Sequence, residues 1–215
     1  RHGGVIISDV VGLGKTYIAA MLGKLLDGRK LFIVPPVVKD NWESVLADFG
    51  YKMSDKVVSL GIVDQLSEMD DIASYKYVFI DEAHRFRNAS STEFQYLKKI
   101  CYGKGVILIT ATPQNNTILD IANLITLFQD SRNSSIIPGN HNLEKYFNEL
   151  YKEVKVSKND PTVVSNIAAE IRDNVLRHVL IRRTRSEITQ YYKEDLEKQG
   201  LKFPTVNDPI RLDYM

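Results

Sequence analysis

Residues 5–16 read VIISDVVGLGKT, a short apolar run followed by a glycine-containing turn. The run VIIS has the β-branched composition of a buried strand. Gly14, Lys15 and Thr16 match the end of the phosphate-loop pattern G-x-x-x-x-G-K-[ST], but Asp9 stands where the first glycine of that pattern belongs. A strand, a tight turn and a helix start in this order favour polyphosphate binding, because backbone N–H groups and the positive end of the helix dipole point at the turn.

The turn supplies candidate nucleotide ligands. We expect Gly12 and Gly14 to permit the tight turn. Lys15 would neutralise the β- and γ-phosphates of a nucleotide, and the Thr16 hydroxyl would ligate Mg²⁺. The alternative is an ordinary strand–helix turn in which Gly-Lys-Thr occurs by chance. The predicted nucleotide-binding residues are Gly12, Leu13, Gly14, Lys15, Thr16 and Tyr17.

Strands and helices alternate through the first half of the chain. Helices are predicted near 15–27, 38–48 and 91–101, and Ser90 with Glu93 resembles a capping box for the last of them. This alternation predicts an α/β fold with a mostly parallel sheet and helices on both faces, and ligands then bind beyond the carboxyl ends of the strands. The strands are predicted at 5–8, 31–34, 57–60, 77–81 and 105–110.

The remainder of the chain is predicted to be mainly helical, with helices at 118–128, 143–152 and 161–180. Asp160 and Pro161 suit the cap and first turn of the last helix. We expect residues 1–130 to form the nucleotide-binding part. Residues 131–215 would be a helical extension packed on that part and the start of a linker, with an extended tail at 203–215.

Composition restricts the class of protein. The chain has 215 residues, of which 44% are hydrophobic and 26% are charged, as in soluble globular proteins. Its apolar runs are too short to span a bilayer, so no membrane partner is expected. Cys101 is the only cysteine, which favours a cytoplasmic location. A net charge of +1 neither requires nor excludes a nucleic-acid partner.

A second candidate chemical site lies within the run YVFIDEAH at 77–84. Two consecutive carboxylates at the end of a buried strand are the form expected of a Walker B segment. Asp81 would hold the magnesium ion, and Glu82 would orient and deprotonate the attacking water. The alternative is a strand that ends in a charged, solvated turn. The predicted catalytic residues are Lys15, Asp81 and Glu82, and the predicted metal ligands are Thr16 and Asp81.

The loop DVVGLGKT and the sequence DEAH together resemble the first RecA-like domain of superfamily 2 helicases and translocases, in particular the Swi/Snf-like branch. In that branch an aspartate commonly replaces the first loop glycine, as Asp9 does here. LFIVPPVVKDNWESVLADF at 31–49 resembles motif Ia of the family, and VILITATPQNN at 106–116 resembles motif III. LIRRTRSEI at 180–188 resembles the arginine pair that closes the first lobe.

The resemblance implies a RecA-like P-loop NTPase fold and the ATP-binding lobe of an ATP-dependent DNA translocase or helicase. Its cofactors would be ATP and Mg²⁺, and its partners would be nucleic acid, with duplex DNA favoured, and a second RecA-like lobe. His84, Thr110 and Thr112 would couple nucleotide state to nucleic-acid contact, although they could equally be structural.

The resemblance also places nucleic-acid contacts near motifs Ia and III and after the Walker B segment. Each of these residues could equally be a solvated surface residue, and Trp42 is expected to be a packing residue rather than a base-stacking platform. Arg182, Arg183 and Arg185 could bind phosphate or the second lobe, or they could form structural salt bridges. The predicted nucleic-acid contacts are Lys39, Asn41, Arg85, Gln114 and Asn115.

In the family the second lobe supplies arginine fingers, and the chain is expected to be part of a larger protein. Loss of an arginine finger lowers the hydrolysis rate by about 10³–10⁵-fold, so these residues alone should hydrolyse ATP very slowly. A non-catalytic binding module with the same fold is the main alternative. A different phosphate-loop enzyme, such as a small-molecule kinase, would leave the motif III and arginine segments unexplained.

Overall fold

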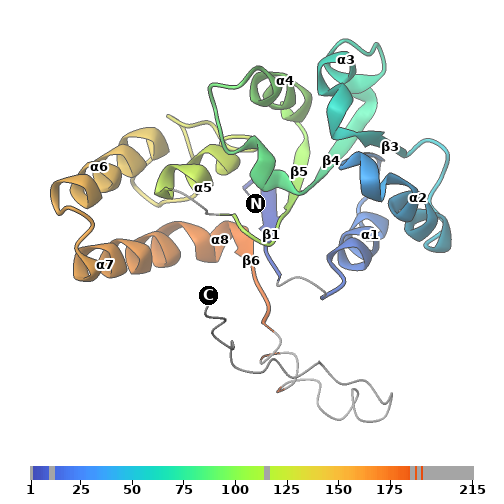
Figure 1. Ribbon diagram of the computed structural model, residues 1–215. Helices are drawn as coiled ribbons and strands as arrows, with labels where there is room; N and C mark the ends of the chain where they lie inside the picture. The colour runs from blue at the N-terminus through green and yellow to red at the C-terminus, as the bar shows by residue number, and fades with distance from the viewer. Residues whose placement is uncertain (1, 10–12, 114–116, 185–186, 188–189, 191–215) are drawn as a thin grey trace, which may run out of the picture. The chain divides into compact units, whose positions relative to one another are not determined.

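The computed structural model describes residues 2–9, 13–113, 117–184, 187 and 190 (Figure 1). The chain divides into two compact units, residues 1–182 and 183–215. The helices and strands described below belong to the first unit. The expected extended tail at 203–215 lies outside the described residues.

The first unit is built on a six-stranded sheet in which every neighbouring pair of strands is parallel. The strand order is β3-β2-β4-β5-β1-β6. The predicted parallel α/β sheet is confirmed, and five of the strands lie at the predicted positions. The strands are β1 (Gly4–Ile7), β2 (Arg29–Val34), β3 (Lys56–Ser59), β4 (Tyr75–Asp81), β5 (Gly105–Ile109) and β6 (Leu180–Ile181).

Side-chain alternation along the strands separates two hydrophobic cores. Phe32 and Phe79 point to one face of the sheet, where they pack with α1 (Lys15–Leu25) and α2 (Lys39–Asp48). Their neighbours Ile33 and Ile80 point to the other face. Because both faces of a parallel sheet are covered by crossover helices, the central parts of the strands, such as Leu31–Val34 and Val78–Ile80, are continuous apolar runs.

The second face is covered by the remaining helices, and the helical extension shares its core. Phe147 and Ile167 belong to the same buried cluster as Ile6 and Leu108 of the sheet. The proposed boundary at residue 130 stays a prediction, because both sides of it lie in one compact unit. The helices on this face are α3 (Val63–Ser67), α4 (Thr92–Cys101), α5 (Ile118–Ile125), α6 (Leu143–Val156), α7 (Pro161–Ile171) and α8 (Arg177–Val179).

The helix predicted at 161–180 is interrupted. After α7, residues Arg172–Leu176 form a π-helical turn, α8 ends at Val179, and Leu180 enters strand β6. The predicted cap is confirmed, since Asp160 Oδ1 accepts hydrogen bonds from the N–H groups of Thr162 and Val163 at 2.8 and 3.3 Å.

Strand β6 was not predicted from the sequence, because it has only two residues, Leu180 and Ile181, at the end of a helical pattern. It pairs with β1, and the Ser8 N–H donates to the Ile181 carbonyl at 2.7 Å. Such a short run carries no periodicity of its own, so only the neighbouring strand defines it.

The predicted capping box at Ser90 is wrong by one residue. The Ser91 hydroxyl accepts from the Phe94 N–H at 3.2 Å and caps α4, while the Ser90 hydroxyl donates to Asn88 Oδ1 at 2.8 Å. Either serine has a suitable side chain, and the turn formed by Asn88 decides between them. Short helices of three to five residues, such as α3 and the 3₁₀ turn Ala83–Phe86, were also not predicted.

Gly23 allows α1 to pack closely on the aromatic side of the sheet. The Tyr51 hydroxyl donates to the Ala20 carbonyl at 2.6 Å, and a Cβ on Gly23 would overlap that hydroxyl and lie 3.3 Å from Phe79 Cζ. Gly23→Ala should therefore lower the free energy of unfolding by about 1–3 kcal/mol, the usual cost of overpacking.

The measurement is urea unfolding of the 215-residue chain, and Gly61→Ala is the matched control. A Cβ on Gly61 would have its nearest neighbour, Ser59 Oγ, at 3.6 Å, so this variant should be close to wild type. A Gly23→Ala protein as stable as the wild type would show that α1 can move away from Tyr51 at no cost.

Candidate nucleotide-binding site

The two predicted chemical segments lie at the same end of the sheet, where the parallel strands β1 and β4 both end (Figure 1). The turn before α1 follows β1, Asp81 ends β4, and Thr110 follows β5, which lies between those two strands. Because the strands are parallel, their carboxyl ends face the same side, where ligands bind in open α/β sheets.

The backbone at the start of α1 is arranged for an anion. Gly14 is the N-cap residue, with φ 69° and ψ 36°, and no side chain caps the helix. This left-handed conformation favours glycine, and the uncapped N–H groups of the first turn remain suited to an external acceptor. Lys15 Nζ donates to the Asp9 carbonyl at 3.0 Å, so the lysine lies along the turn.

The remaining loop residues differ in exposure. Leu13, Lys15 and Thr16 are half-buried, whereas Tyr17 is exposed on the surface of α1. Gly12 lies outside the described residues. Asp9 is fully buried and is not among the described residues with a positive φ, so the backbone at this position has no need of a glycine.

Asp81 is held by two hydrogen bonds. Its Oδ2 accepts from the Trp42 indole N–H at 2.9 Å, and its Oδ1 accepts from the Glu82 backbone N–H at 2.9 Å. Trp42 is 1% exposed and packs on Phe32, with ring centroids 5.6 Å apart. The carboxylate at the end of β4 is thus oriented by a residue of α2.

The predicted packing role of Trp42 is confirmed, but the sequence analysis missed its hydrogen bond to Asp81. A signal was available, because a buried indole N–H almost always has an acceptor and few acceptors lie near an apolar core. The sequence does not show that Trp42 and Asp81, which are 39 residues apart along the chain, lie next to each other in the fold.

Glu82 has an unusual backbone conformation. Its φ of 51° and ψ of 42° lie in the left-handed region, which costs a non-glycine residue about 1–2 kcal/mol. Strained residues of this kind cluster at functional sites. The conformation turns the chain at the end of β4 and brings Glu82 Oε2 within 3.1 Å of His84 Nδ1.

His84 links this carboxylate to the end of β5. Its Nδ1 also lies 3.2 Å from the hydroxyl oxygen of Thr110, which is fully buried. Thr112 joins through its backbone N–H, which donates to the Thr110 hydroxyl at 3.2 Å. The residues predicted to couple nucleotide and nucleic acid therefore form one connected network with Glu82.

A pocket of about 360 Å³ opens beside Asp81 and Glu82, and Arg85 is one of its lining residues. Lys39 begins α2 and pairs with Glu43 at 3.4 Å, while Asn41 is exposed. The structure therefore leaves these three predicted nucleic-acid residues at the surface. Gln114 and Asn115 lie outside the described residues.

The donor set suits a Mg²⁺–nucleotide complex better than a free metal ion. Among the described residues, no cluster of three or more His, Cys, Asp or Glu side chains could hold a metal. Mg²⁺ usually takes one or two protein oxygens and completes its shell with water and substrate phosphates. Thr16, in the first turn of α1, and Asp81, at the end of β4, fit that requirement.

The fold is that of a RecA-like domain, a parallel sheet flanked by helices. A solved structure of the Sulfolobus solfataricus SWI2/SNF2 ATPase core in complex with dsDNA has a similar fold, with a TM-score of 0.58, 20% sequence identity, and coverage of 85% of this chain and 40% of that one. The predicted RecA-like fold is confirmed by this likeness.

Residues 51–202 match the model of the SNF2-related domain, and the chain belongs to that family. It is 26% identical to the uncharacterized ATP-dependent helicase YqhH of Bacillus subtilis over 213 residues, covering 90% of this chain and 35% of the relative. It is 25% identical over 214 residues to the ISWI chromatin-remodeling complex ATPase ISW2 of Saccharomyces cerevisiae, covering 85% of this chain and 18% of the relative. The chain thus spans about a third or less of these relatives.

None of the helices in the described part of the chain is long and apolar enough to cross a membrane.

The Trp42–Asp81 hydrogen bond should contribute measurably to stability. Trp42→Phe keeps an aromatic ring in the core but removes the donor to a carboxylate, which should lower the free energy of unfolding by about 1.5–3 kcal/mol. Urea unfolding followed by circular dichroism measures this loss. Tyr102→Phe, at a tyrosine that is 86% exposed, is the control and should be neutral. Equal stability of Trp42→Phe and wild type would contradict the assignment.

Proposed function

We propose that this chain is the ATP-binding lobe of an ATP-dependent DNA translocase that couples ATP hydrolysis to movement along nucleic acid. The observation that carries the proposal is the placement of the Gly14-Lys15-Thr16 turn and the Asp81-Glu82 pair at the same end of the parallel sheet. Membership of the SNF2-related family supports it.

The turn would bind the phosphates of ATP. The backbone N–H groups that follow Gly14 supply neutral donors, and Lys15 supplies a positive charge once it leaves the Asp9 carbonyl. The Thr16 hydroxyl would be one ligand of Mg²⁺, and Asp81 would hold the ion directly or through water. When bound, Mg²⁺ neutralises charge on the phosphates.

Glu82 would orient the attacking water and accept its proton. Its left-handed backbone places the carboxylate beside His84 rather than in the hydrogen-bonded position of Asp81, so the two neighbouring carboxylates can have different roles. His84 and Thr110 would transmit a change at Glu82 to the segment after β5.

Nucleic acid would be the track, and duplex DNA is the favoured form. The similar SWI2/SNF2 ATPase core was solved in complex with dsDNA, and this supports the choice. Lys39, Asn41 and Arg85 would contact the phosphate backbone with Gln114 and Asn115, positioning the strand without reading its sequence.

A second RecA-like lobe would complete the active site by supplying arginine fingers, and a cytoplasmic location would suit the protein. The greater length of the relatives supports a larger functional unit. The alternative is a non-catalytic module that binds nucleotide or a partner with the same fold.

Substitution of Glu82 separates these two functions. In the protein that contains this chain with its second lobe, Glu82→Gln should lower DNA-stimulated ATP hydrolysis by about 10²–10⁴-fold, the usual contribution of a general base. Nucleotide affinity should stay near wild type because no phosphate contact is lost. Lys15→Ala is the comparison and should weaken nucleotide binding itself. Unchanged hydrolysis in Glu82→Gln would favour the binding module.

The 215-residue chain alone should bind Mg-nucleotide weakly and hydrolyse it very slowly. Absence of an arginine finger costs about 10³–10⁵-fold in rate. The measurement compares phosphate release without nucleic acid and with duplex DNA, single strands or RNA at fixed salt. Rapid, nucleic-acid-stimulated hydrolysis by this chain would contradict the need for a second lobe.

A further inference from the structure

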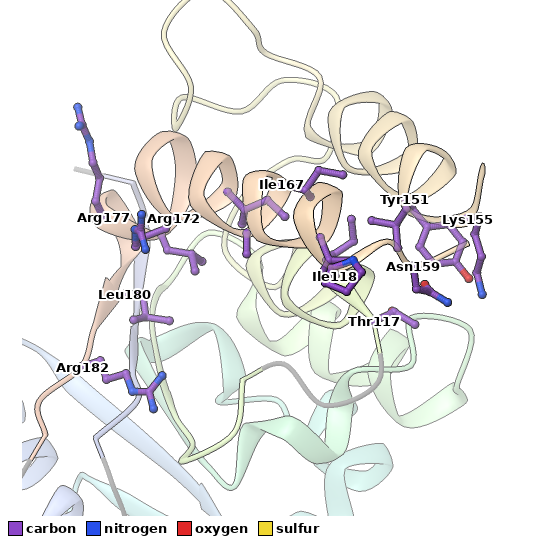
Figure 2. A pocket seen from close by; sticks show the side chains of 16 residues that line it. Thr117, Ile118, Tyr151, Lys155, Asn159, Ile167, Arg172, Arg177, Leu180 and Arg182 are labelled. Carbon is purple, nitrogen blue, oxygen red and sulfur yellow. The ribbon is translucent and has the colours of Figure 1, made fainter. Parts of the chain in front are cut away.

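A groove of about 780 Å³ lies on the helical extension, along α7 and between the start of α5, the end of α6 and strand β6 (Figure 2). Arg182, named above as a possible phosphate contact, is one of its lining residues, whereas the Gly14-Lys15-Thr16 turn and the Asp81-Glu82 pair do not line it. The groove is therefore separate from the proposed site of ATP hydrolysis.

The floor of the groove is apolar. Ile167 and Ile171 of α7 are buried beneath it, while Val164 on the same helix is 39% exposed. These positions are spaced three and four residues apart, so they form one stripe along the helix. The other apolar lining residues are Ile118, Val154, Ala168, Leu176 and Leu180.

The rim of the groove is positively charged. Lys155 lies at one end, and Arg172, Arg177 and Arg182 lie toward the other (Figure 2). All four are exposed, and no aspartate or glutamate is among the described residues that line the groove, although Arg172 Nε donates to Asp173 Oδ1 at 3.3 Å beside it. The chain as a whole carries a net charge of only +1, so this is a local concentration of cations.

The π-helical turn Arg172–Leu176 contributes to this arrangement. An extra residue in one turn rotates everything that follows by about 100° relative to a regular helix. Arg172 and Leu176, at the two ends of the turn, both line the groove, and Arg177 follows them. π turns are rare and are frequently found at functional sites.

We propose that this groove binds an amphipathic helix of a partner protein, with apolar side chains on one face and carboxylates beside them. The apolar stripe would receive hydrophobic anchors at helical spacing, as in other helix-in-groove complexes. The arginines at the rim would form paired hydrogen bonds with carboxylates. The phosphates of a nucleic acid would pair with the cations of the rim but would leave the apolar floor uncovered. A cationic rim beside an apolar floor therefore favours a protein ligand.

Synthetic helices test the proposal directly. The probe is a fluorescein-labelled peptide of about four helical turns with leucines on one face and glutamates beside them. Two matched peptides carry lysines in place of the glutamates or serines in place of the leucines. Fluorescence anisotropy with the 215-residue chain should show binding of the acidic leucine peptide only. Failure of that peptide to bind, or equal binding of the serine peptide, would overturn the proposal.

Charge reversal locates the binding surface. The double variant Arg172→Glu/Arg177→Glu should lower the affinity for the acidic leucine peptide at least tenfold. Lys155→Glu, at the other end of the groove, should also lower this affinity. Lys52→Glu/Lys152→Glu changes the charge equally at exposed lysines outside the groove and should leave affinity unchanged. Circular dichroism of each variant checks that the fold is intact. If both double variants lower the peptide affinity equally, the effect comes from the net charge of the chain, and a defined binding groove is contradicted.

Two further measurements test other occupants. If labelled duplex DNA, rather than the peptide, loses affinity in Arg172→Glu/Arg177→Glu, the groove is a nucleic-acid surface and the proposal is wrong. If the wild-type chain self-associates in sedimentation velocity and the same double variant is monomeric, a second copy of the chain is the occupant. Neither result would bear on nucleotide binding, which Lys15 tests separately.

Discussion

The hydrogen bond from the Trp42 indole to Asp81 is the constraint on which the site depends. It joins α2 to the end of β4 and fixes one carboxylate at the sheet edge. The indole can make this bond only because its ring is buried against Phe32, which stacks on Phe79 with centroids 4.7 Å apart. Packing on one face of the sheet therefore determines the geometry of a polar group at its edge, and the core and the site cannot be treated separately.

The sequence predicted the fold and the chemistry-bearing segments because each depends on local patterns. Strand composition, the Gly-Lys-Thr turn and the paired carboxylates are all read within about ten residues. It did not predict β6, the Trp42–Asp81 bond or the π turn, since these depend on a neighbouring strand, on distance through the core, or on one extra residue in a helix. The error at Ser90 is different, because two adjacent serines offered the same chemistry and the turn at Asn88 selected the other.

Asp9 and Glu82 illustrate opposite relations between backbone and side chain. Asp9 replaces a glycine that the general phosphate-loop pattern contains, and its backbone does not require one. Glu82 occupies a left-handed conformation that would suit glycine, at a position where the proposed chemistry needs a carboxylate. Glycine is thus absent at Asp9, where the backbone does not need it, and also at Glu82, where the proposed role of the carboxylate would outweigh about 1–2 kcal/mol of strain.

Strand β6 has a mechanical consequence. Its last residue, Ile181, accepts a hydrogen bond from the Ser8 N–H at 2.7 Å, and Ser8 is followed directly by Asp9, whose carbonyl receives Lys15. Tension on the chain beyond Arg182 would therefore reach the phosphate-loop lysine through two hydrogen bonds and one peptide unit.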